Sequence, residues 1–131
     1  MENRSESRKK IMTILYQMSV YDKNKMKYEI DDVIKEVSEF DSEFIKEVVY
    51  GVVTYKNDID KLANKYLNNW TIDRLGNTDI AILRMGIYEL MYTDTPDIVC
   101  INEAVELAKA YSDDDVRKMI NACLDKIYHN K

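Results

Sequence analysis

The stretch IAILRMGIYELMY, residues 80–92, decides the fold, because its apolar side chains recur at the three- and four-residue steps of an α-helix. Its strongly apolar character predicts a helix at the centre of the core. Gly86 costs about 1 kcal/mol relative to alanine in a helix interior, so we expect a close packing contact there. The residues predicted to face the core are Ile80, Leu83, Ile87, Leu90 and Met91.

Helical spacing continues on both sides of this stretch. One apolar stretch, from Phe44 to Tyr66, is long enough for one helix or for two that break near Asn57. Three glycines and one proline leave few helix breakers, so we predict an all-α fold. A chain of 131 residues fits one domain over its whole length. The other apolar stripes lie in residues 11–21, 28–37, 102–111 and 116–127.

Residues that can cap a helix predict where the helices begin. Side-chain oxygens of Ser, Thr, Asp and Asn accept hydrogen bonds from the free N–H groups of a first turn. Pro96 favours a stop, and the following IVC, residues 98–100, is expected to be a short extended run. The expected caps are Ser5 or Ser7, Asp41 or Ser42, Asn77 or Thr78, and Ser112, with Asp113, Asp114 and Asp115 filling the last helix's first turn.

Charge is distributed unevenly along a chain whose formal net charge is −5. Residues 1–27 hold seven Lys or Arg against three Asp or Glu, whereas residues 28–60 hold three against ten. The remainder holds nine against eleven. A basic start on an acidic body is typical either of a local nucleic-acid footprint or of a solvated first helix.

The sequence lacks the clusters that carry most enzyme chemistry. The sole histidine, His129, lies close to the end of the sequence, and the glycines are isolated. Cys100 and Cys123 do not form a zinc-binding or redox pair and are expected to be reduced core residues. No apolar run is long enough for a membrane span, and no secretory signal is present, so we expect a cytoplasmic protein. We predict a binding module with no catalytic residue, metal or cofactor.

Three separated motifs carry a family resemblance. They are ILRMGIYEL at 82–90, PDIVCINEAVELAKAY at 96–111 and INACLDKI at 120–127, and SRKKIMTILYQM at 7–18 agrees with them. In order and spacing these closely resemble the NusB family of transcription antitermination factors. The resemblance implies about seven helices in two small antiparallel bundles. It also implies binding to the boxA element of leader RNA together with the ribosomal protein NusE, in an RNA polymerase elongation complex with other Nus factors that supports ribosomal RNA transcription.

The resemblance places RNA contacts at both ends of the chain. The arginine-rich start falls here on Arg4, Arg8, Lys9 and Lys10, where phosphate contacts would give salt-dependent affinity. In the last helix the family's H-K-F-V-N-G corresponds to Arg117, Lys118, Met119, Ile120, Asn121 and Ala122. Met119 therefore replaces an aromatic residue expected to stack on a base, and it could pack in the core or contact RNA. Asn121 is expected to fix either the last helix or the RNA backbone.

The same resemblance places the partner surface on Tyr16, Asp79, Glu89 and Asp115. Carboxylates suit a basic ribosomal protein, and we expect this acidic flank to lie beside the basic start of the chain. Each residue also has an ordinary structural explanation: Asp79 and Asp115 in helix first turns, Tyr16 half-buried in the core, and Glu89 solvated.

Two other functions remain open from sequence. A NusB-like domain also occurs fused to ribosomal RNA cytosine methyltransferases, where it assists RNA binding. A purely structural homodimer is the third reading, and some family members do self-associate.

Overall fold

The computed structural model describes residues 2–131 as seven α-helices and one short 3₁₀ helix, and no strand occurs among these residues. The predicted all-α fold is confirmed. The helices are α1 (Arg4–Lys23), α2 (Ile30–Val37), α3 (Glu43–Thr54), α4 (Lys56–Tyr66), α5 (Asn77–Tyr92), α6 (Asp97–Tyr111) and α7 (Asp114–Asn130), and the 3₁₀ helix η1 is Ile72–Arg74.

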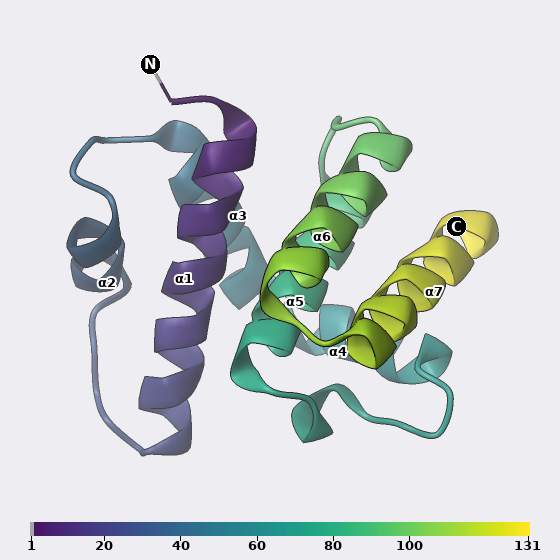
Figure 1. Ribbon diagram of the computed structural model, residues 1–131. Helices are drawn as coiled ribbons and strands as arrows, with labels where there is room; N and C mark the ends of the chain where they lie inside the picture. Colours follow the sequence, from purple (N-terminus) through teal and green to yellow (C-terminus); the bar gives the residue numbers. More distant parts are fainter. Residues whose placement is uncertain (1) are drawn as a thin grey trace.

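The helices form two bundles that share α5 as their contact (Figure 1). Helices α1, α2 and α3 make one bundle, and α4, α6 and α7 surround α5 in the other. Because neighbours pack on α5 from both bundles, it is buried on nearly every side, and Arg84 is the one residue between Ile80 and Leu90 that is not. A helix that is apolar all round belongs in a core, so the predicted central position is confirmed.

Helices α1 and α5 lie antiparallel. Arg8 near the start of α1 contacts Glu89 near the end of α5, while Leu15 and Met18 share a small cavity with Ala81 and Arg84. The end of α1 is therefore next to the start of α5. This antiparallel arrangement determines which of the predicted site residues lie at the same end of the molecule.

The two internal glycines of α3 and α5 are contact points. A methyl group at Gly86 would lie 3.2 Å from Leu124 Cδ1 and 3.3 Å from Ala104 Cβ, so the expected close packing is present and involves α6 and α7. At Gly51 a methyl group would lie 2.2 Å from the ring of Tyr88, so α3 needs glycine there to receive that ring.

Several predicted helix boundaries were wrong. Asn3 caps α1 by accepting a hydrogen bond from the Glu6 N–H, so α1 begins before Ser5. Gly76 precedes α5 without a side-chain cap, and Asp113, not Ser112, caps α7. Ser42 caps α3, which is one of the two residues predicted.

Of two other local predictions, one is wrong and one is confirmed. The IVC run is helical, because Pro96 sits at the N-cap of α6 with the backbone angle that suits a helix start. The long apolar stretch is broken near Asn57, which is one of the two outcomes predicted: Tyr55 separates α3 from α4.

Candidate RNA- and partner-binding surfaces

A buried ion pair joins the two bundles at the start of α1. Arg8 Nε donates to Glu89 Oε1 at 2.6 Å and Nη2 donates to Glu89 Oε2 at 2.8 Å, and both residues are 2% exposed. Such a two-point contact fixes both the distance and the orientation of the two helices. Neither charged group is therefore accessible at the surface. The predictions of an RNA contact at Arg8 and a partner contact at Glu89 are corrected accordingly, because each side chain occupies the other.

Glu103 of α6 extends this ion pair toward the surface. Arg8 Nη1 lies 3.3 Å from Glu103 Oε1, which also accepts a hydrogen bond of 2.5 Å from the Ser5 hydroxyl. Burial alone would lower the pKa of Arg8, but the hydrogen bonds to Glu89 and the charges of Glu89 and Glu103 raise this pKa above its ordinary value. The guanidinium therefore stays charged, and α1 is tied to α5 and α6 at one point.

The other basic residues at the start of α1 are more accessible. Arg4 is exposed, with its guanidinium carbon 4.5 Å from the centroid of the Phe44 ring. Lys9 is exposed and makes no ion pair among residues 2–131. Lys10 pairs with Glu2 at 2.6 Å, and this contact, with a hydrogen bond from Ser7, lowers the pKa of Glu2. Within the described part of the chain, Arg4 and Lys9 are the cations of this end that make no ion pair.

The predicted RNA residues of the last helix lie in the first half of α7. Lys118 and Asn121 are exposed, and Asn121 makes no side-chain hydrogen bond within the described chain. Asn121 is thus not what holds α7 in place. Met119 packs partly against the core but also lines a cavity of about 70 Å³ with Tyr66 and Lys126, so one side of it faces outward.

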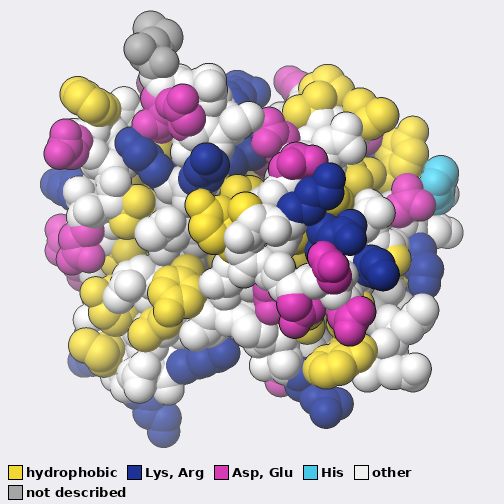
Figure 2. Space-filling model, viewed as in Figure 1, with side chains coloured by type: hydrophobic (Ala, Val, Ile, Leu, Met, Phe, Trp, Pro, Cys, Tyr) yellow, Lys and Arg dark blue, Asp and Glu magenta, His cyan; other side chains and the backbone are white. Residues whose placement is uncertain are grey.

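One face of the molecule presents both basic groups. Figure 2 shows Lys and Arg side chains over the start of α1 and again over α6 and α7, with carboxylates between them. On α7, Arg117 lies 3.7 Å from Asp114, a loose and exposed contact that an incoming phosphate could replace. The two groups lie on different helices of this face, so a ligand that contacts both must extend across it.

Three of the four predicted partner residues, Tyr16, Asp79 and Asp115, lie at the N-terminal end of α5, opposite to the end that carries Glu89. Asp79 accepts a hydrogen bond from the Ser112 hydroxyl at the turn between α6 and α7, and Asp115 is exposed just beyond that turn. Tyr16 is 40% exposed, and since Arg8 is level with Glu89, the antiparallel register brings Tyr16 level with Ala81. Glu89 lies at the other end.

The expected adjacency of the acidic flank and the basic start of the chain is wrong. Asp79 and Glu89 are separated by about 15 Å, because a helix rises about 1.5 Å per residue. The acidic flank formed by Asp79 and Asp115 therefore lies at the opposite end of α5 from Arg4 and Lys9. The two surfaces are at different ends of one rigid helix.

Sequence reasoning missed Glu103 and Phe44, which hold the basic start of α1. Glu103 binds Arg8 and Ser5, and the Phe44 ring lies against Arg4 and Arg8. Neither pairing has a local sequence signal, because the partners come from different helices. Lys109 was also missed: it is an exposed cation on α6, paired with Glu106 at 3.3 Å.

The described residues contain no cluster of three or more potential metal ligands. Across residues 2–131, no helix combines the length and the apolar character that a membrane crossing requires. The surfaces described above present charged groups, hydrogen-bonding groups and exposed helix faces that a ligand can contact.

Comparison with known proteins identifies the family. The model of the NusB family matches residues 5–129. The chain belongs to the NusB family. It is 45% identical over 125 residues to the transcription antitermination protein NusB of Halalkalibacterium halodurans, covering 95% of this chain and 92% of that protein. It is 42% identical over 126 residues to NusB of Staphylococcus aureus, with 95% and 98% covered.

Solved structures agree with this family assignment. NusB of T. maritima matches with a TM-score of 0.84 and 28% identity, over 98% of this chain and 92% of that one. The crystal structure of antitermination factors NusB and NusE in complex with dsRNA matches with a TM-score of 0.83 and 26% identity, over 98% and 97%. The predicted family and fold are confirmed, and so is the expectation of a factor that is not an enzyme.

The buried ion pair between Arg8 and Glu89 leads to a prediction about the stability of this NusB family member. Arg8→Ala leaves the Glu89 carboxylate buried without a partner, which costs about 3–5 kcal/mol of unfolding free energy. Urea denaturation measures this loss. The double variant Arg8→Met with Glu89→Leu should recover most of it, because an apolar pair of similar volume leaves no fully buried charge unpaired and Glu103, which loses Arg8, is partly exposed to water.

Lys9→Ala, next in sequence but exposed, is the matched control and should change stability by less than about 0.5 kcal/mol. Equal losses for Arg8→Ala and Lys9→Ala would show that the ion pair does not hold the bundles together.

Proposed function

We propose that this NusB family member is a transcription antitermination factor that binds boxA-type leader RNA together with the ribosomal protein NusE and supports ribosomal RNA transcription. In this role it acts in the cytoplasm, as one RNA-binding domain over residues 1–131, within an RNA polymerase elongation complex containing other Nus factors. The observation that carries the proposal is the match, over nearly the whole of both chains, to the NusB of a NusB–NusE–dsRNA complex.

The basic face supports the RNA part of the proposal. Arg4 and Lys9 at the start of α1, with Lys118 and Asn121 on α7, are exposed and available to phosphates and bases. Because these groups lie at two ends of one face, the RNA would run as an extended strand between them. Lys10 and Arg117 would join it by exchanging their carboxylate partners for phosphates.

The acidic flank supports the partner part. Asp79, Asp115 and Tyr16 lie at the end of α5 away from Arg4, so a basic ribosomal protein could bind there without covering the start of α1. Glu89 contributes indirectly, by holding Arg8 and thereby the position of α1. Met119 and Tyr66 together could present a surface to a base beside this flank.

The methyltransferase-associated alternative is not favoured. Full-length relatives named transcription antitermination protein NusB are covered over 92–98% of their own lengths by this chain. The similarity is therefore to free-standing NusB proteins.

Lys9→Ala should weaken binding to boxA RNA and reduce the dependence of log affinity on log salt by about 0.7–0.9, the effect of one lost phosphate contact. Fluorescence titrations with NusE present, across salt concentrations, measure both quantities. Lys23→Ala removes the same charge from the exposed end of α1 and is the matched control. Identical salt slopes for the two variants would remove Lys9 from the RNA surface.

Asp115→Asn should slow association with NusE and leave boxA affinity almost unchanged, because a rim carboxylate chiefly steers a basic partner. Surface plasmon resonance gives the two rate constants. Asp125→Asn, a second exposed acid on α7, serves as control. A larger effect of Asp115→Asn on RNA than on NusE would mean that the two surfaces have been assigned in reverse.

A further inference from the structure

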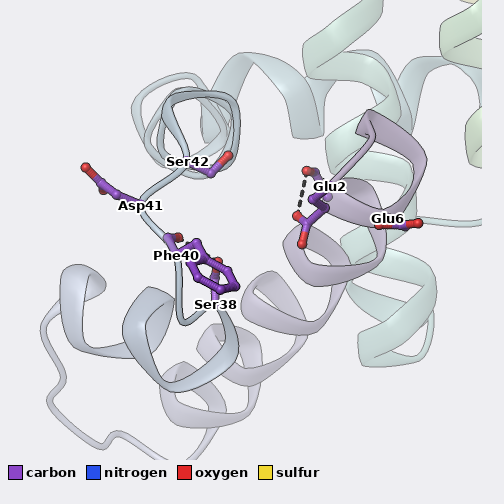
Figure 3. A pocket seen from close by; sticks show the side chains of 7 residues that line it. Glu2, Glu6, Ser38, Phe40, Asp41 and Ser42 are labelled. Atoms are coloured by element: carbon purple, nitrogen blue, oxygen red, sulfur yellow. Dashed lines mark hydrogen bonds between the residues drawn. The ribbon is translucent and has the colours of Figure 1, made fainter.

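A groove between the start of α1 and the loop joining α2 to α3 has no role in the function proposed above. It consists of two adjoining cavities of about 620 Å³ and 360 Å³, which share Ser38, Phe40, Asp41 and Ser42 as lining residues. Figure 3 shows Phe40 on the loop side and Glu2 on the α1 side of the larger cavity. The groove is large enough to receive several side chains of a partner.

Phe40 is the most exposed large apolar side chain of the described residues, at 75% exposure. Its backbone is nonetheless held in place, because the carbonyl oxygen of Phe40 accepts a hydrogen bond of 2.9 Å from the buried Ser38 hydroxyl, and Ser42 caps α3. A fixed loop thus presents an aromatic ring to the groove. An exposed apolar ring with a prepared cavity beside it is typical of an interaction site.

The charges around the ring favour a cationic occupant. Five carboxylates line the two cavities, against two lysines. Glu2 is paired with Lys10 and Asp41 with Lys46, each at 2.6 Å, but Glu6 and Glu39 make no ion pair within residues 2–131. The carboxylates are Glu2, Glu6, Asp31, Glu39 and Asp41, and the lysines are Lys35 and Lys46.

The same molecule already contains the contact that such an occupant would make. Arg4 and Arg8 lie over the ring of Phe44 at 4.5 Å and 5.3 Å, and Arg8 is held there by carboxylates. Phe40 offers an equivalent aromatic ring with carboxylates beside it, but no arginine of residues 2–131 lies over this ring. A cation over an aromatic face and next to carboxylates is stabilised by both.

We propose that this groove is a second protein-docking site, which binds an arginine-rich segment with interspersed apolar residues from a protein other than NusE. An arginine stacks on Phe40 between the α1 and loop carboxylates, and an apolar residue fills the remaining cavity. RNA is disfavoured here, because the carboxylates repel phosphates. The site lies beside Glu2 and Glu6 of the α1 end, so it is separate from the acidic flank at Asp79 and Asp115.

The test uses the full chain and a fluorescein-labelled arginine–leucine repeat peptide, with a glutamate–leucine repeat as the negative probe. Anisotropy titrations compare Phe40→Ala with Met26→Ala, another exposed apolar residue, and Glu39→Gln with Glu36→Gln on the outer face of α2. Phe40→Ala should weaken peptide binding about tenfold, whereas Met26→Ala should change it less than about twofold. Glu39→Gln should weaken it more than Glu36→Gln.

Circular dichroism melting confirms that each variant folds, and boxA and NusE titrations separate this site from the proposed function. The proposal predicts that Phe40→Ala leaves both of those affinities unchanged and that saturating NusE does not displace the peptide. It is overturned if the peptide fails to bind the unmodified chain, if Phe40→Ala and Met26→Ala behave alike, or if NusE or RNA competes with the peptide. These outcomes do not depend on whether boxA binding itself is found.

Discussion

The buried pair of Arg8 and Glu89 is the interaction on which the arrangement of this molecule depends. A two-point contact between 2%-exposed side chains joins α1 of one bundle to α5 of the other. Its net contribution to stability is small or even unfavourable compared with an apolar pair, because both charges lose their water. Its consequence is geometric: it fixes the register of two antiparallel helices, and through Glu103 it also includes α6.

That register separates the basic start of α1 from the acidic flank. The end of α5 near Glu89 carries the accessible cations Arg4 and Lys9, and the opposite end carries Asp79 and Asp115. Because α5 is buried by neighbours from both bundles, the two ends cannot move independently without disturbing the core. In this way the chain can hold the basic start of α1 and the acidic flank at a fixed separation.

The fold could be predicted because it depends on repeated local patterns. Apolar spacing in residues 80–92 placed the core helix, and the family motifs placed the rest. Helix starts were less predictable, since Asn3 and Asp113 have nearby serines that can also cap, and α5 begins after Gly76 with no side-chain cap at all. The site was least predictable. From sequence, Arg8 is expected to be solvated because it lies in a basic segment. Its partner Glu89 is 81 positions away in the sequence and contacts it only in the folded chain.

The central claim is that RNA and partner bind different surfaces of one rigid scaffold, which adjoin on α7, and that both can be bound at the same time. Isothermal titration of NusE into the chain alone and into the chain saturated with boxA RNA tests this most directly. The account predicts one NusE bound per chain in both titrations, with an affinity in the presence of RNA equal to or higher than that without it. Displacement of the RNA by NusE, or loss of NusE binding once RNA is present, would contradict it.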